Sequence, residues 1–124
     1  MSLPAVTVVR MFTVDFIEFP SGSATASGRF FREAFGWTPV SYGPDYVDVQ
    51  GGGIGLGFQA DAGEKPNAPL VTIRADDLDQ ARDAIEAAGG VVTVEPFDFP
   101  GGRRFHFREP GGCELAVWRP VTTD

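Results

Sequence analysis

The chain has 124 residues, of which 43% are hydrophobic and 22% are charged, a size that suits one domain with one core of ordinary size. Its net charge of −7 repels phosphate backbones and anionic lipid surfaces, so we expect neither a nucleic-acid nor a membrane partner. Neither a run of about 18 apolar residues nor the pattern of a signal peptide is present, so we expect a cytoplasmic protein.

The sequence contains one cysteine, Cys113, and one histidine, His106. A single cysteine cannot form an internal disulfide. A single histidine excludes the metal sites that need two imidazoles. Cys113 precedes Glu114 and has no histidine nearby in sequence, so its thiol is predicted to be inert.

The first half of the chain predicts one helix among several strands. Val6–Phe19 is rich in β-branched and aromatic residues, which favour a long strand. Ser23 or Thr25 is placed to cap a helix that Gly36 would end. The apolar positions of this helix recur at helical spacing and make it amphipathic. They are Phe30, Phe31, Ala34 and Phe35. Three short strands are predicted next: Thr38–Ser41, Tyr46–Gln50 and Ile54–Gln59.

The glycines and aspartates of this half are explained by turns and strand edges. Gly51–Gly53 lies in a segment that resembles a phosphate-binding loop, but no helix follows and no lysine completes it. We therefore predict a hairpin turn followed by a strand that excludes bulk. Asp15, Asp45 and Asp48 are of the type that binds Mg²⁺, yet turn and edge positions account for them.

The second half repeats the order of the first, after a linker predicted over Ala60–Pro69. Asp76 or Asp77 would cap the second helix, and Gly89 would end it. One face of that helix carries its apolar positions, Leu78, Ala81, Ile85 and Ala88. The predicted strands are Leu70–Ala75, Val91–Val94, Arg104–Arg108 and Glu114–Arg119. Two units of one strand, one helix and three strands indicate an internal duplication.

Several local motifs match a known superfamily in order and spacing. They are Phe16–Pro20, Phe30–Trp37, Ala75–Asp79 with Glu86–Gly90, Phe107–Gly112 and Val117–Pro120. With the tandem βαβββ pattern, they resemble the vicinal oxygen chelate superfamily of glyoxalase I, bleomycin-resistance proteins and extradiol dioxygenases. The resemblance implies an α+β fold in which unit one, about residues 5–59, and unit two, about residues 70–120, form a curved mixed sheet around a cavity. Residues 60–69 join the units within a single domain, 1–124.

The resemblance also implies where metal ligands would lie. Alignment by the flanking motifs places Phe16, Leu70 and Ala116 at three ligand positions and Gly57 near the fourth. None of these residues can coordinate a metal. We therefore expect neither a metal nor another cofactor.

Two residues are candidates for acid–base chemistry. Glu18 follows Phe16 by two positions on the first strand, so both side chains share the face that lines the cavity in this superfamily. A carboxyl group there has a raised pKa and can act as a base or bind a cation; the structural alternative is a Glu18 paired with an arginine such as Arg74. His106 shares a face with Arg104 and Arg108, which favours a solvated or rim position.

The expected ligand-binding residues are those on the cavity face of the strands, together with aromatic residues that would line the cavity. They are Phe16, Glu18, Phe58, Thr72, Ala116 and Trp118. Trp37 and Trp118 are open to a second interpretation, as core packing. The predicted function is metal-independent binding of a small molecule, with an aromatic or cationic compound sequestered as in bleomycin-resistance proteins. Two alternatives stay open: a glyoxalase-like lyase or isomerase that uses Glu18 or His106, and a regulatory or scaffold dimer.

A homodimer is expected because bare βαβββ units leave sheet edges and apolar faces uncovered. Met11, Phe12 and Phe97 are the expected contributors to its interface.

Overall fold

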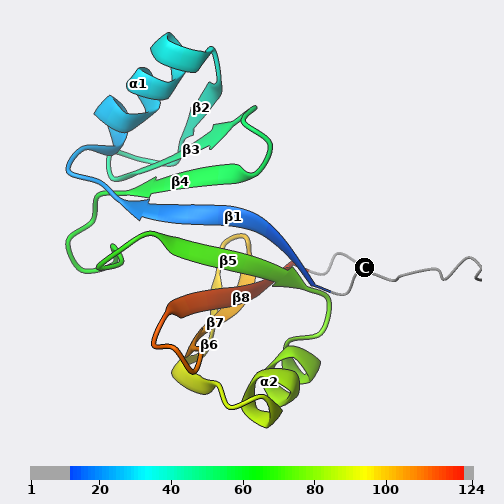
Figure 1. Ribbon diagram of the computed structural model, residues 1–124. Coiled ribbons are helices and arrows are strands. Elements are labelled where there is room, and N and C mark those ends of the chain that lie inside the picture. Colours follow the sequence, from blue (N-terminus) through cyan, green and yellow to red (C-terminus); the bar gives the residue numbers. More distant parts are fainter. Residues whose placement is uncertain (1–11, 122–124) are drawn as a thin grey trace, which may run out of the picture.

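The computed structural model describes residues 12–121 of the chain, which fold into eight strands and two helices (Figure 1). In chain order they are β1 (Phe12–Pro20), α1 (Ala24–Phe35), β2 (Thr38–Ser41), β3 (Tyr46–Gln50), β4 (Gly55–Gln59), β5 (Leu70–Ala75), α2 (Leu78–Ala87), β6 (Val91–Phe99), β7 (Gly102–Arg108) and β8 (Glu114–Pro120). The βαβββ pattern predicted for each half is present. Residues 6–11 of the predicted first strand lie outside the described part of the chain.

All eight strands form one curved sheet in the order β2-β3-β4-β1-β5-β8-β7-β6. Within each unit the first strand pairs in parallel with the last, β1 with β4 and β5 with β8. The two units join through the antiparallel pairing of β1 with β5. The sheet is therefore mixed, and the α+β class expected from the sequence is confirmed.

Both helices begin and end at residues suited to those positions. The Ser23 side chain accepts a hydrogen bond from the Ala26 amide at 3.2 Å, and the Asp77 side chain accepts one from the Gln80 amide at 3.1 Å. Gly36 ends α1 with φ of 73°, a left-handed conformation that glycine adopts without strain.

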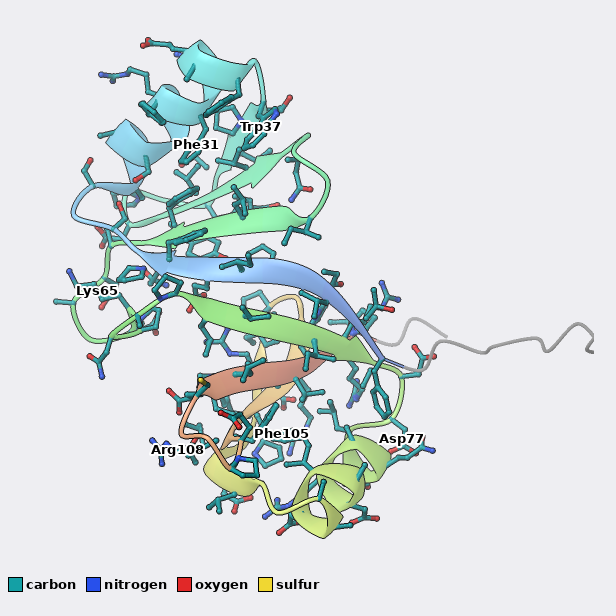
Figure 2. All side chains as sticks on the ribbon, in the orientation of Figure 1. Phe31, Trp37, Lys65, Asp77, Phe105 and Arg108 are labelled. Carbon is teal, nitrogen blue, oxygen red and sulfur yellow. The ribbon has the colours of Figure 1, made fainter. Side chains whose placement is uncertain are left out.

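The helices pack on the outer face of the sheet, where two separate hydrophobic cores form. The first lies between α1 and the strands of unit one and includes Val49, Phe58 and Phe31. The second lies between α2 and the strands of unit two and includes Leu78 and Phe105. Figure 2 shows Phe31 beneath α1 and Phe105 beside the strands near α2.

The inward face of α1 differs from the predicted one. Phe30 and Phe35 are both 57% exposed, whereas Ala24 and Gly28 are buried. Gly28 permits this close approach, since a Cβ at that position would lie 2.9 Å from Cγ1 of Val47. The helix therefore contacts the sheet through its small residues and Phe31.

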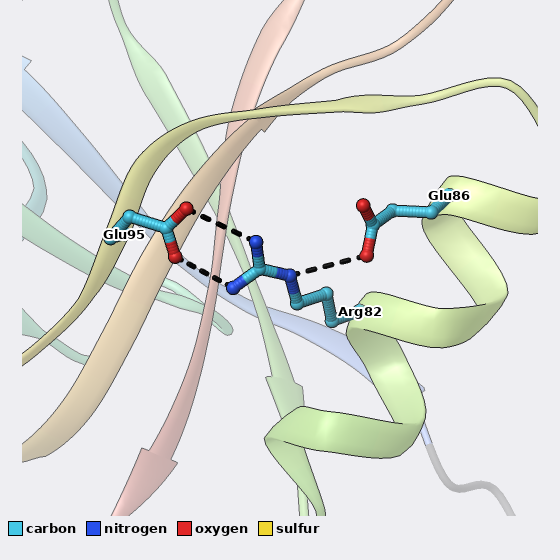
Figure 3. Close-up of polar contacts among 3 residues, drawn as sticks. All are labelled: Arg82, Glu86 and Glu95. Atoms are coloured by element: carbon cyan, nitrogen blue, oxygen red, sulfur yellow. Dashed lines mark hydrogen bonds and ion pairs between the residues drawn. The ribbon is translucent and has the colours of Figure 1, made fainter.

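Strand β6 extends five residues beyond its predicted end and contains Pro96. It lies at the edge of the sheet, where a proline without an amide hydrogen is tolerated. Its register with β7 shifts between Val94 and Phe97. Arg82 of α2 holds this irregular segment through two bonds to Glu95, at 2.6 and 3.1 Å, and also bonds Glu86 (Figure 3).

Candidate functional site

The face of the sheet opposite the helices, which we call the inner face, collects most of the predicted site residues. In the sheet, Phe16 pairs with Thr72, Thr72 with Ala116, and Ala116 with His106. Because paired residues on neighbouring strands point to the same side, these four form one row across β1, β5, β8 and β7. Glu18 and Trp118 share this face by strand alternation.

An ion pair joins the two units across the inner face. Nη1 of Arg104 on β7 lies 3.6 Å from Oε1 of Glu18 on β1. Strands β5 and β8 separate these residues in the sheet, so the contact depends on the curvature of the sheet. The sequence leaves open, as the alternative to an acid–base role, a Glu18 paired with an arginine such as Arg74. Glu18 does have an arginine partner, and that partner is Arg104. Burial raises the pKa of Glu18, and the charge of Arg104 opposes this rise.

The sequence predicts a solvated or rim position for His106, and the structure places it half-buried on the inner face. His106 and Arg104 are both half-buried, and only Arg108 on that side of β7 is exposed. The guanidinium of Arg104 lies 5.2 Å from the ring centre of Phe97, and the ring centres of Phe97 and His106 are 6.0 Å apart. Burial, followed by the nearby charge of Arg104, lowers the pKa of His106, so its imidazole is neutral at pH 7.

Trp118 is fixed on the inner face by a polar contact. Its indole Nε1 donates a hydrogen bond to Oδ1 of Asp15 at 2.9 Å. Asp15 lies at the point where the β1–β5 register shifts. Arg74 lies 5.8 Å from the centre of the indole ring.

Tyr46 and Asp48 of β3 add a second polar group to the inner face. Asp48 pairs with Gly57, which in turn pairs with Glu18. Burial raises the pKa of the Asp48 carboxyl, and the nearby Tyr46 hydroxyl opposes this rise. A Cβ at Gly57 would overlap both the Tyr46 hydroxyl and the Phe16 ring. The sequence predicts a strand with no room for larger side chains at its glycines. The close approach of Tyr46 and Phe16 to Gly57 is the reason for this restriction.

Among residues 12–121, four buried side-chain atoms on the inner face have no hydrogen-bond partner. They are Asp48 Oδ1, Thr72 Oγ1, Arg104 Nε and His106 Nε2. Thr72 as a whole is only 4% exposed. Buried polar atoms are paired in the great majority of folded proteins, so four unpaired ones on a single face indicate a place that a polar molecule would complete.

Phe58 is the one predicted ligand-binding residue that lies elsewhere. It belongs to the first core, and its ring stacks on Phe19 and Phe31 at centroid distances of 5.4 and 5.2 Å. Trp37 also packs there, against Phe31.

Several inner-face residues are absent from the ligand-binding set expected from the sequence, namely Tyr46, Asp48, Phe97, Phe99 and Arg104. Strand alternation relative to buried Val47 and Val49 would have placed Tyr46 and Asp48 on the inner face. No sequence signal places Phe97 and Phe99, because their orientation depends on the register shift in β6.

The donor set on the inner face does not suit a metal ion. Phe16, Gly57, Leu70 and Ala116 occupy the positions implied for ligands, and none has an oxygen, nitrogen or sulfur atom in its side chain. Within residues 12–121, no three His, Cys, Asp or Glu side chains are arranged to hold a metal. The residues therefore do not fit the metal centre that the resemblance implies.

Comparison with known proteins supports the same fold. The family model described as the Glyoxalase/Bleomycin resistance protein/Dioxygenase superfamily matches residues 13–117. The chain therefore belongs to this superfamily. Among the described residues, no helix is long and apolar enough to cross a membrane.

Individual relatives are distant. The anthracycline biosynthesis protein DnrV of Streptomyces peucetius is 28% identical over 130 residues, which cover 84% of this chain and 46% of the relative. The chain thus spans about half the length of the curated relative it matches. Methylmalonyl-CoA epimerase from Mycobacterium tuberculosis is 13% identical with a TM-score of 0.73, and each chain covers 95% of the other. The Mn(II)-bound glyoxalase from Novosphingobium aromaticivorans is 20% identical with a TM-score of 0.65, over 90% of this chain and 41% of that one. At these identities the two structures show the fold alone.

Proposed function

We propose that the protein binds a small aromatic compound on its inner face without a metal. The observation that carries this proposal is the set of four buried polar atoms without partners on that face. An unsatisfied buried polar group costs about 1–3 kcal/mol, so a ligand that pairs with these atoms recovers free energy that the ligand-free protein lacks. Polar ligand groups are therefore expected at Thr72, His106, Arg104 and Asp48.

Aromatic side chains around these atoms favour a planar ligand. Phe16 and Trp118 come from β1 and β8, and Phe97 comes from the edge strand β6. Such rings bind flat apolar surfaces and stack on aromatic ligands. The curated relative is named for anthracycline biosynthesis, which is compatible with a small organic ligand for this chain.

The test uses the unpaired Thr72 hydroxyl. Thr72→Val keeps the side-chain shape and removes the unsatisfied oxygen, so the ligand-free variant should unfold at a higher temperature than wild type. A panel of small aromatic compounds is then screened by thermal denaturation in EDTA, since a ligand that binds only the folded state raises its stability. We expect compounds that stabilise wild type to stabilise Thr72→Val less. Thr38→Val, at an exposed position of β2, is the matched control and should respond like wild type.

Two results would overturn the proposal. One is a panel without any compound that stabilises the EDTA-treated protein. The other is an equal ligand response in Thr72→Val and Thr38→Val, because the unpaired atoms would then play no part in binding.

A second candidate function is a glyoxalase-like lyase or isomerase. It is favoured by His106, whose Nε2 has no partner and whose pKa is lowered, and by Glu18, whose pKa is raised. Turnover of the hemithioacetals of 2-oxoaldehydes would support it, provided that Glu18→Gln and His106→Gln reduce the rate. Binding without turnover favours the first proposal. Absence of both favours the regulatory or scaffold dimer.

We also propose a homodimer. Phe12 and Val14 at the start of β1 are 45% and 46% exposed, and they offer an apolar patch to a second copy. Phe97 is half-buried against Arg104, which reduces its availability for an interface. Met11 lies outside the described residues. Sedimentation at micromolar concentration should give a mass near twice the 13.3 kDa of one chain, and a monomer mass would contradict the proposal.

A further inference from the structure

Glu18 and Asp48, two carboxylates of the inner face, differ in their partners among the described residues. Glu18 is paired with Arg104 at 3.6 Å, and its side chain is 6% exposed. Its negative charge is therefore already balanced. A ligand cation would have to compete with Arg104 for Glu18, so Glu18 is a poor site for recognising one.

Asp48 is in the opposite situation. None of the ion pairs found in residues 12–121 includes Asp48. Its Oδ1 atom is buried and accepts no hydrogen bond from the part of the chain that the structure describes. Tyr46 precedes Asp48 by two residues on β3, so the two side chains share the inner face. Asp48 thus offers a buried acceptor oxygen without an ion-pair partner among the described residues.

Two aromatic side chains, Phe16 and Tyr46, approach the strand partner of Asp48. Gly57, the strand partner of Asp48, has no side chain, and the space above it is taken by the Phe16 ring and the Tyr46 hydroxyl. A carboxylate next to aromatic rings is the combination that attracts organic cations, because ring faces and carboxylates both carry negative potential. The unpaired Oγ1 of Thr72, which is 4% exposed on the same face, is an independent sign that this face takes a ligand.

We propose that Asp48, Tyr46 and Phe16 form a subsite for an organic ammonium group, and that Asp48 is the specificity-determining carboxylate. This inference rests on the proposed binding function of the inner face. The aromatic part of the ligand extends from the ammonium group toward Thr72 and His106. The net charge of −7 on the whole chain also favours the approach of a cation.

The test compares three probes of similar shape that differ in charge: tyramine, which is cationic, 4-propylphenol, which is neutral, and 3-(4-hydroxyphenyl)propanoate, which is anionic. Calorimetric titration should show that wild type binds tyramine most tightly. Asp48→Asn keeps the shape and removes the charge, so it should weaken tyramine roughly tenfold and leave 4-propylphenol unchanged. Asp45→Asn, in the exposed turn before β3, is the matched control, and it should keep the wild-type preference.

A second measurement uses wild type alone, so its result does not depend on whether Asp48→Asn folds. Nuclear Overhauser contacts should link the methylene group next to the tyramine ammonium with the ring protons of Phe16 and Tyr46. The inference is overturned if these contacts fall elsewhere, if none of the three probes binds at millimolar concentration, or if Asp48→Asn and Asp45→Asn behave alike. If 4-propylphenol binds and Thr72→Val weakens it while tyramine has no advantage, the proposed function stands and the ammonium subsite falls.

Discussion

Separating Glu18 from Arg104 would show how the inner face balances its charges. The two side chains are 6% and 20% exposed, and Oε1 lies 3.6 Å from Nη1. At an effective dielectric constant of about 20, their attraction is about 5 kcal/mol before the cost of removing both charges from water. We expect that cost to leave a measured coupling free energy of about 1–3 kcal/mol. Arg104→Met alone leaves Glu18 as an uncompensated buried charge, so it should destabilise the fold by about 3–5 kcal/mol.

The assay is urea denaturation of wild type, Glu18→Gln, Arg104→Met and the double variant at pH 7. The double variant should be more stable than Arg104→Met, because it no longer buries a lone carboxylate. Burial raises the pKa of Glu18 above its value of 4.5 in the unfolded chain, and loss of Arg104 should raise it further. The folded variant then binds a proton that the unfolded chain has released. Its deficit relative to wild type should therefore grow as pH rises above about 4.5. Two results would refute the conclusion that Arg104 balances the buried charge of Glu18. One is a coupling free energy below about 0.5 kcal/mol, and the other is a stability loss in Arg104→Met that does not depend on pH.

Three other substitutions test separate parts of the structure. Phe105→Ala should lower the free energy of unfolding by about 3–5 kcal/mol, since Phe105 is fully buried, and a loss below about 1 kcal/mol in urea denaturation would contradict that packing. Gly57→Ala should displace the Tyr46 hydroxyl and cost about 1–3 kcal/mol by the same assay, whereas Gly22→Ala, which meets open space, should change little. Burial lowers the pKa of His106 below its unfolded value of 6.5, so wild type should gain stability relative to His106→Gln as pH rises toward 6.5, by less than about 1.4 kcal/mol per pH unit. Parallel pH profiles of wild type and His106→Gln would refute this last prediction.

Much of the fold could be predicted because its signals are local. Ser23 and Asp77 cap the helices through bonds to amides three residues away, and Gly36 ends α1 through its own backbone conformation. Such features depend on a few neighbouring residues, so the sequence displays them directly. The repeated order of strands and helix was then enough to predict the α+β class and the division into two units.

The parts that could not be predicted depend on residues far apart in sequence. Strand β6 passes through Pro96, a residue that propensity places outside strands, because its edge position needs no amide donor there. Arg82 of α2 and Glu95 of β6 come together only after the chain has folded. The register shift beside them turns Phe97 toward Arg104.

The burial of Arg104 and His106 has a similar origin. Alternation along β7 correctly separated these residues from Phe105 and Phe107, but the charge of Arg104 and Arg108 favoured a solvated or rim position for their side. Periodicity assigns residues to two faces without showing which face the sheet encloses. Curvature brings Glu18 of the other unit to Arg104, and a charged residue becomes half-buried because it has found a partner.

The inner face lacks metal-ligating side chains at the positions that the family resemblance implies, and yet it is polar. The same strand periodicity explains why. Phe16 and Leu70 occupy two of those positions, and Glu18 and Thr72 each follow one of them by two residues on the same strand. A spacing of two keeps a side chain on the same face, so polar groups remain close to where ligating atoms would lie. They are spread over β1, β3, β5 and β7 instead of converging on one point. A spherical ion needs convergent donors, whereas an extended organic molecule needs donors and acceptors distributed along its length, and the arrangement of Asp48, Thr72 and His106 meets the second requirement.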